Sequence, residues 1–174
     1  TQALLGMDGV EKRIDLAALA TVADIVPLME ENRVIVREGM MRMGTSARPG
    51  LKKLMELAQV YDALTPLRAP LQRGEYDLHR MVREALMNAG LPAAHEVRLA
   101  PRCRIDLMCG DIGIEIKRGK PVPARLLPQL TRYCACTEVA GLLLVSEGRV
   151  RLPATLCGKP VRNLSLNQLW GIAL

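Results

Sequence analysis

The chain has 174 residues, 49% apolar and 24% charged, a composition that excludes wholesale disorder and suits one ordinary domain or two small ones. No run approaches roughly 18 uncharged apolar residues, and the first residues lack the basic region and cleavage site of a secretory signal, so we expect neither a membrane span nor export. The net charge of +6 is uneven: residues 66–174 hold 16 Lys and Arg against nine Asp and Glu, and this excess of +7 predicts a polyanionic partner, most often nucleic acid.

Aromatic residues and cysteines narrow the function classes further. Aromatics make up 2% of the chain, which argues against a platform of rings that stacks single-stranded bases. The five Cys are an odd number without a repeated C-x-x-C spacing, as in a reduced protein. We therefore expect a cytoplasmic location.

The first third of the chain is typical of successive helices. Residues 12–58 contain three apolar-periodic stretches, KRIDLAALATVAD, ENRVIVREGMMRM and RPGLKKLMELAQV. Residues 65–74, TPLRAPLQRG, combine two prolines with no periodicity, as a linker does. We therefore predict a small helical domain over residues 1–65 and a second domain over residues 68–174.

The second part of the chain alternates strands and helices. EYDLHRMVREALMNAG has a helical apolar stripe, while HEVRLA, CRIDLM and IGIEIK are typical of short strands, the last two joined by the compact turn CGD. PARLLPQLTRYCACTEV predicts a helix that is interrupted or begins at Pro128, AGLLLVSE a strand buried on both faces, and LSLNQLWGIA a short closing helix. This order predicts an α/β (α+β) fold with a mixed sheet flanked by helices.

The segment RIDLMCGDIGIEIK concentrates charged residues on two of these strands. Residues i and i+2 of a strand point to the same face, so Glu115 and Lys117 project together while the isoleucines beside them are buried. If the hairpin closes around residues 109–111, Asp106 of the paired strand reaches the same face. Two carboxylates and one ammonium then converge. The simpler interpretation is an exposed hairpin edge with a Glu–Lys surface pair.

Two carboxylates with room for water suit Mg²⁺ or Mn²⁺, which prefer oxygen ligands. A metal held by Asp106 and Glu115 can polarise a phosphate oxygen and lower the pKa of an attacking water. Lys117 can position that water or offset the charge that builds on the phosphate oxygens. The sequence therefore predicts phosphodiester hydrolysis, with these three side chains as the catalytic residues.

The pattern of Asp106 followed by Glu115-Ile-Lys117 resembles the Asp…(Asp/Glu)-x-Lys core of the PD-(D/E)xK nuclease superfamily. The resemblance covers about residues 70–150, and Ile105 stands where the family usually has Pro. It implies a restriction-endonuclease-like mixed sheet and a metal-dependent nuclease.

Further residues match this family by spacing. Gln129 and Tyr133 resemble the Q-x3-Y motif of its RecB-type exonuclease branch, which implies that they help to hold substrate. Glu75, at the start of the preceding helix, resembles the glutamate that many members use as a further metal ligand, and Glu84 on the same helix could take its place.

His79 lies one helical turn from this glutamate, where it could touch metal or phosphate, although a partly buried helix residue is the simpler reading. Arg118 and Lys120 follow the motif and would face the DNA backbone, or else belong to a solvated basic loop. The same alternatives apply to four more arginines: Arg102, Arg104, Arg125 and Arg132.

Residues 12–60 show a second resemblance, to a fragment of the RecJ-type single-strand exonucleases of the DHH phosphoesterase family. The stretch TVADIVPL matches that family's fourth motif, in which the Asp, here Asp24, is a metal ligand. The family's other ligands come from earlier Asp-rich motifs and an Asp-His-His triplet, which this sequence lacks. One carboxylate cannot hold a two-metal site, so Asp24 is a doubtful metal remnant and a helix cap is its simpler role.

Two functions remain open. One is a divalent-metal-dependent DNA nuclease, either an exonuclease or an endonuclease, in DNA repair, recombination or the processing of phage or mobile-element DNA. Its expected partner is single- or double-stranded DNA, and it could act as a homo-oligomer or in a larger nuclease assembly. The alternative is a non-catalytic nucleic-acid-binding or assembly module on an inherited nuclease fold. Stabilisation by Mg²⁺ or Mn²⁺ separates the two, because a preserved site responds by mass action.

Overall fold

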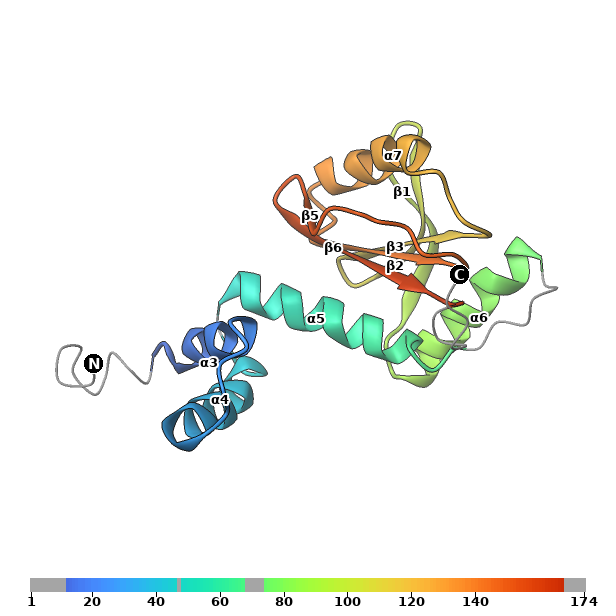
Figure 1. The fold of residues 1–174 in the computed structure, drawn as a ribbon. Coiled ribbons are helices and arrows are strands. Elements are labelled where there is room, and N and C mark those ends of the chain that lie inside the picture. The colour runs from blue at the N-terminus through green and yellow to red at the C-terminus, as the bar shows by residue number, and fades with distance from the viewer. Residues whose placement is uncertain (1–11, 47, 68–73, 168–174) are drawn as a thin grey trace. The chain divides into compact units, whose positions relative to one another are not determined.

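The computed structural model describes residues 12–46, 48–67 and 74–167, apart from the side chain of Glu75. The chain forms two compact units, Thr1–Met55 and Glu56–Leu174 (Figure 1). The division falls within helix α5 (Pro49–Leu64). The predicted linker at residues 65–74 lies largely outside the described residues, and the predicted domain limits stay a prediction.

The first unit contains α3 (Ile14–Ala23), α4 (Glu30–Met43) and the start of α5. Its small core is made by Ala18, Met43 and Leu51, which are almost fully buried. Helices α3 and α4 pack closely where the buried Gly39 of α4 meets Ala18. The prediction of successive helices in this region is confirmed.

The second unit is built on a six-stranded mixed sheet with the strand order β1-β2-β3-β4-β6-β5. The β3–β4 and β4–β6 pairs are parallel and the other pairs are antiparallel. The strands are β1 (Ala93–Ala100), β2 (Cys103–Cys109), β3 (Ile112–Lys117), β4 (Gly141–Ser146), β5 (Thr155–Leu156) and β6 (Lys159–Ser165). The predicted α/β class is therefore correct.

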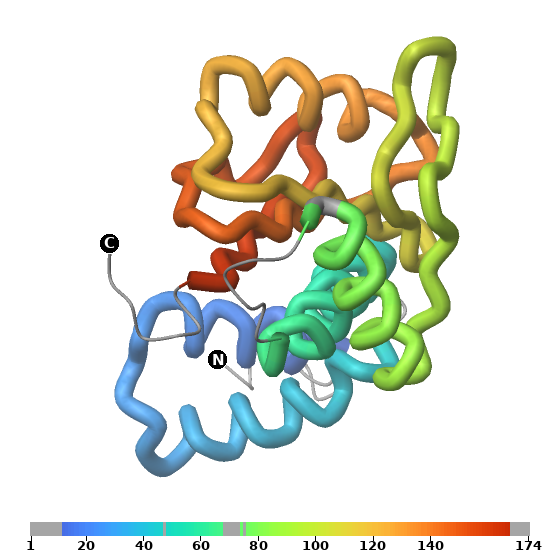
Figure 2. Tube along the Cα trace, turned by 90° about the vertical axis from the view of Figure 1, so that its right-hand side faces the viewer, coloured from blue at the N-terminus to red at the C-terminus, as the bar shows by residue number. Residues whose placement is uncertain are grey.

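Helices α6 (Glu75–Asn88) and α7 (Pro123–Ala135) cover opposite faces of this sheet (Figures 1 and 2). The last part of α5 and α6 bury leucines against one face, together with Ile114 and Ile116 of β3. On the other face α7 packs on β2 and β4. The side chains of β3 alternate between the two faces of the sheet, as the period of two of a strand requires. Glu115 therefore faces α7.

Three local predictions need correction. The segment LSLNQLWGIA is predicted to be a short closing helix, but its first residues, Leu164 and Ser165, end strand β6. Residues 168–174 lie outside the described residues. Pairing of Leu164 with Val145 of β4 fixes the strand, because tertiary pairing overrides a weak local preference. Helix α7 begins at Pro123 and continues through Pro128. Neither the short strand β5 nor strand β6 was predicted.

The described residues include no helix long and apolar enough to cross a membrane.

Candidate functional site

The candidate site lies where strands β2 and β3 separate. Their backbone pairing runs from Cys109 and Ile112 to Leu107 and Ile114 and then stops. Beyond this point the carboxylate of Asp106 replaces a backbone carbonyl as the acceptor. Its Oδ2 accepts a hydrogen bond of 2.7 Å from the N–H of Ile116. The side chain of Asp106 is 23% exposed, so its carboxylate stands at an opening in the sheet.

Glu115 is the most buried charged residue described, with a side chain only 1% exposed. Its Oε1 lies 2.6 Å from Nζ of Lys117 and accepts a 2.8 Å hydrogen bond from Nε2 of Gln129. Its Oε2 is buried without a hydrogen-bond partner among the described residues. One carboxylate oxygen is thus held by two donors, whereas no described donor compensates the other.

The electrostatics of the site favour an added cation. Burial and, next, the negative charge of Asp106 raise the pKa of Glu115 to about 7, although the hydrogen bond and the charge of Lys117 act in the opposite direction. Two carboxylates that repel each other at a buried position are relieved when a cation binds between them. Oxygen donors of this kind fit Mg²⁺ or Mn²⁺.

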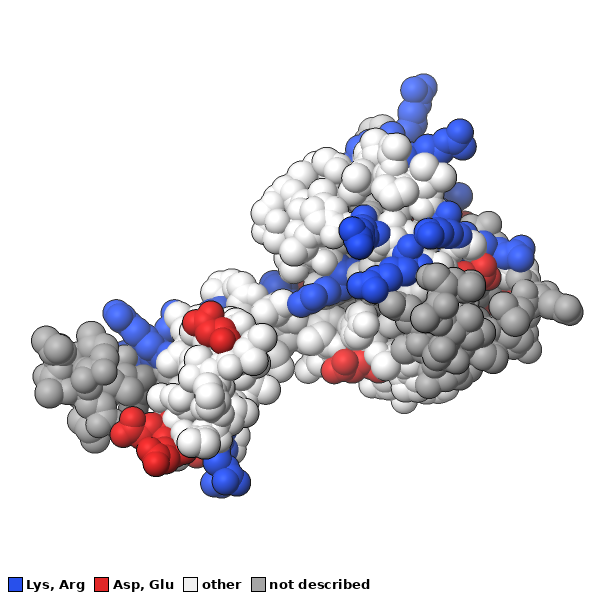
Figure 3. All heavy atoms as spheres, viewed as in Figure 1, with Lys and Arg blue, Asp and Glu red and all other residues white. Residues whose placement is uncertain are grey.

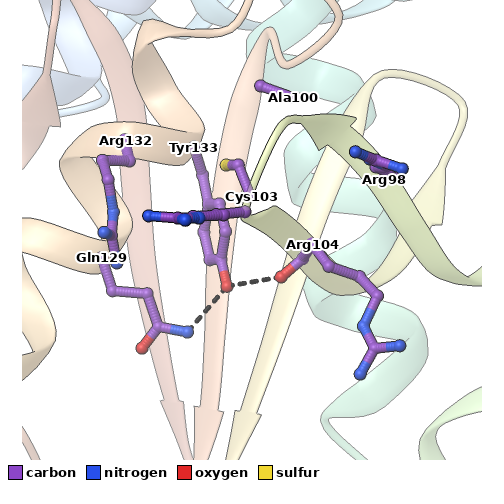
Figure 4. Close-up of a pocket in the computed structure, with 8 residues that line it drawn as sticks. Arg98, Ala100, Cys103, Arg104, Gln129, Arg132 and Tyr133 are labelled. Atoms are coloured by element: carbon purple, nitrogen blue, oxygen red, sulfur yellow. Dashed lines mark hydrogen bonds between the residues drawn. The ribbon is translucent and has the colours of Figure 1, made fainter.

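Helix α7 is tied to both strands by a chain of hydrogen bonds. Nε2 of Gln129, which holds Glu115, is also 2.7 Å from the hydroxyl of Tyr133. That hydroxyl donates a 2.8 Å bond to the backbone carbonyl of Arg104 in β2 (Figure 4). Burial and the charge of Glu115 raise the pKa of Tyr133, so the phenol keeps the proton that it donates. Gln129 and Tyr133 therefore fix the position of Glu115.

On the opposite side of the site, α6 presents His79. Its side chain is 16% exposed and its Nε2 lies 3.9 Å from Oδ2 of Asp106, beyond hydrogen-bond distance. Its ring packs edge-on against His95, with centroids 5.9 Å apart. Glu84 is exposed and lines a hollow of about 350 Å³ with the two histidines. The side chain of Glu75, the first residue of α6, lies outside the described residues.

The remaining predicted residues lie further from the carboxylates. Arg118 and Lys120 are exposed beyond the end of β3, and Nε of Arg118 lies 3.9 Å from a carboxylate oxygen of Glu147. Asp24 belongs to the first unit, where it is the exposed C-cap residue of α3. In the described part of the chain no three His, Cys, Asp or Glu side chains form a ready metal site. A metal beside Asp106 and Glu115 would therefore need further ligands.

Sequence reasoning missed two contributions to this region. The backbone carbonyl of Arg104 accepts the tyrosine hydroxyl, a contact across 29 residues that no local pattern indicates. Arg98 pairs directly with Arg104 across β1 and β2 and received no role. A β-bulge between Arg98 and Ala100 shifts the register, so a count outward from the β1–β2 turn would have paired Leu99 with Arg104 instead.

Comparisons with known proteins match a short part of the chain. The single-stranded-DNA-specific exonuclease RecJ of Bacillus subtilis is 46% identical over 48 residues, which are 28% of this chain and 6% of that protein. The protein of the same name from Escherichia coli is 50% identical over 46 residues, 26% of this chain and 8% of that protein. This chain carries a RecJ-like segment but spans only a small part of the length of these relatives.

No protein family and no solved structure matches the chain. The resemblance to the PD-(D/E)xK superfamily is therefore unsupported by comparison and rests on the residues of the second unit.

The raised pKa of Glu115 predicts how stability depends on pH without metal. Between about pH 4.5 and 7 the folded protein keeps a proton on Glu115 that the unfolded chain releases, so the free energy of unfolding falls as pH rises through this window. The Glu115→Gln variant has no ionisable group at this position. We therefore expect its free energy of unfolding to lack this fall, which is on the order of 3 kcal/mol. Urea unfolding of both proteins in EDTA at pH 5, 6, 7 and 8 measures the difference. Parallel stability curves for the two proteins would show that Glu115 titrates normally.

Proposed function

We propose that this protein is a divalent-metal-dependent DNA nuclease that hydrolyses phosphodiester bonds, with Asp106, Glu115 and Lys117 as its catalytic residues. The observation that carries the proposal is the buried carboxylate of Glu115, with one oxygen held by Lys117 and Gln129 and the other without a partner. A protein that used Glu115 only for stability would satisfy both oxygens, because an unpartnered buried polar atom destabilises the fold. The same three residues carry the resemblance to the PD-(D/E)xK superfamily.

In this proposal Asp106 and Glu115 hold Mg²⁺ or Mn²⁺, with Glu75 or Glu84 as candidates for a further ligand. The bound metal would supply Lewis-acid polarisation of a phosphate oxygen and acidify a water. Lys117, 29% exposed and beside Glu115, is placed to orient the attacking water or to stabilise negative charge on the phosphate. Gln129 and Tyr133 act as positioning residues, because they lock Glu115 against α7.

The choice of DNA as substrate rests on charge and on the RecJ-like segment. Residues 66–174 carry an excess of +7, and in the view of Figure 3 Lys and Arg side chains outnumber acidic ones on the second unit. The matched relatives are named as single-stranded-DNA-specific exonucleases. We therefore propose single-stranded DNA as the first substrate to test, and a cytoplasmic role in DNA repair, recombination or mobile-element processing, alone or in a larger nuclease assembly.

The direct test is cleavage of labelled single- and double-stranded DNA in Mg²⁺, Mn²⁺ or EDTA. We expect cleavage that needs metal and falls at least about 100-fold in Lys117→Ala, since a charge aimed at the transition state is lost. Lys52→Ala removes an exposed ammonium from the first unit and is the matched control. Equal rates in wild type and Lys117→Ala, or cleavage that persists in EDTA, would contradict the proposal.

The alternative is a non-catalytic nucleic-acid-binding module. It is favoured by the finding that no group of three possible ligand side chains is assembled among the described residues. Thermal unfolding with and without millimolar Mg²⁺ or Mn²⁺ distinguishes the two functions. An unchanged unfolding temperature, together with salt-sensitive DNA binding and no cleavage, would establish the binding module.

A further inference from the structure

A pocket of about 450 Å³ opens beside Gln129 and Tyr133, between α7 and the β1–β2 hairpin (Figure 4). Four arginines line it: Arg98, Arg102, Arg104 and Arg132. No acidic side chain is among its lining residues in the described part of the chain. The pocket therefore concentrates positive charge in a concave space, which is the environment that an anion requires.

The four arginines come from β1, β2, the turn between these strands and α7. Their positions are unfavourable for the stability of the fold. Arg98 in β1 and Arg104 in β2 are direct cross-strand partners, an arrangement in which like charges repel. Arg102 adopts a left-handed backbone conformation with φ of 59° in the turn between these strands, a conformation that is uncommon for residues other than glycine. Arg132 comes from α7.

Acidic side chains compensate little of this charge. Nη1 of Arg104 lies 3.3 Å from Oε2 of Glu96, and both side chains are largely exposed. Arg98, Arg102 and Arg132 form no ion pair with any acidic side chain that the structure describes. An unfavourable cluster of this kind is explained if an anion neutralises it.

The pocket adjoins the proposed catalytic site through shared side chains. Gln129 lines the pocket and also holds Oε1 of Glu115, while Tyr133 lines it and anchors the carbonyl of Arg104. A ligand in the pocket is thus separated from the catalytic carboxylates by the width of these side chains. A nucleotide strand that begins in the pocket therefore starts beside the residue that holds Glu115.

We propose that this pocket binds the terminal phosphate monoester of a nucleic-acid strand, an inference that rests on the proposed nuclease function. Guanidinium groups bind phosphate oxygens through paired hydrogen bonds, and several around one anion are typical of phosphate recognition. A terminal monoester carries about −1.5 to −2 charges at neutral pH, against −1 for a phosphodiester within the strand, so a cluster of arginines favours the terminus. The protein would then engage strand ends, as an exonuclease does.

The test measures binding of one fluorescent single-stranded oligonucleotide by anisotropy in EDTA, where no metal-dependent cleavage occurs. Versions with a 5′-phosphate, a 3′-phosphate or hydroxyls at both ends are compared. We expect one of the two phosphorylated oligonucleotides to bind about tenfold more tightly than the form with hydroxyls at both ends. The position of its phosphate, 5′ or 3′, identifies the end that the pocket binds. Equal affinity of all three forms for the wild-type protein would overturn the proposal.

Variants assign the preference to the pocket. Arg98→Gln combined with Arg132→Gln should abolish the preference for the phosphorylated end and reduce the slope of log affinity against log salt by about 1.4. Arg151→Gln, an exposed arginine that does not line the pocket, should keep the preference. Arg132→Gln alone is the second variant, in case the double variant does not fold, and thermal unfolding is recorded for each. A preference that survives in both folded pocket variants would overturn the proposal.

This experiment is independent of catalysis. If the pocket binds phosphorylated ends but no DNA is cleaved, the proposed function fails and the pocket remains an end-binding site. If DNA is cleaved but all ends bind equally, the nuclease stands and the pocket proposal fails.

Discussion

Asp106→Asn is expected to reduce the rate of metal-dependent DNA cleavage by about a thousandfold while the protein stays folded. The expected loss corresponds to about 4 kcal/mol of transition-state stabilisation, because the variant removes one of the two charged metal ligands. The Asn side chain keeps an oxygen that can accept the N–H of Ile116, so the junction of β2 and β3 keeps its hydrogen bond. Single-turnover cleavage with saturating enzyme measures the chemical step.

Three comparisons make this result specific. Glu138→Gln changes one exposed carboxylate outside the site and should cleave at the wild-type rate. Glu75→Gln and Glu84→Gln decide which residue of α6 serves as the further ligand, because only one of them should share the defect. Addition of Mg²⁺ should raise the unfolding temperature of wild type more than that of Asp106→Asn. A folded Asp106→Asn protein that cleaves normally would refute the assignment of the site.

The sequence predicted those parts of the site that depend on local geometry. The spacing of Glu115 and Lys117 placed both on one face of a strand, and the structure joins them at 2.6 Å. The hairpin turn was expected at residues 109–111, and Cys109 pairs with Ile112 around it. Such features follow from the period of two in a strand and from the short turn, which involve only neighbouring residues.

Contacts between distant elements could not be predicted in this way. The bond from Gln129 to Glu115 joins a helix to a strand, and its Q-x3-Y spacing gave the residues but not their partner. Strand β6 was not predicted and its last residues were assigned to a helix, because its pairing with β4 is a tertiary effect. The pairing of Arg98 with Arg104 depends on a β-bulge between Arg98 and Ala100, which no local pattern in the sequence marks.

Gly39→Ala is expected to destabilise the first unit by about 2 to 3 kcal/mol, as overpacking does in a closely packed contact. Alanine would favour an isolated helix over glycine by about 1 kcal/mol, so helix propensity alone predicts the opposite sign. In the structure, however, a Cβ on Gly39 would overlap the Cβ of Ala18 and the carbonyl oxygen of Ile14. Backbone cannot move aside as a flexible side chain does, so α3 and α4 must separate and expose the core around Met43.

Gly50→Ala is the matched control, because a Cβ at this helical glycine meets nothing within 4 Å. We expect it to be neutral or stabilising by up to about 1 kcal/mol. Hydrogen exchange of the α3 and α4 backbone amides measures both variants, and slower exchange in Gly39→Ala than in wild type would contradict the packing argument.

DNA cleavage by Gly39→Ala then tests whether the two units work separately. The proposed catalytic residues and the arginine pocket all belong to Glu56–Leu174, whereas Gly39 and Asp24 belong to Thr1–Met55. If the second unit is sufficient for the chemistry, cleavage is unchanged although α3 and α4 have loosened. A parallel loss of cleavage would mean that the RecJ-like helices hold substrate or support the nuclease site, even though Asp24 alone cannot form a two-metal centre.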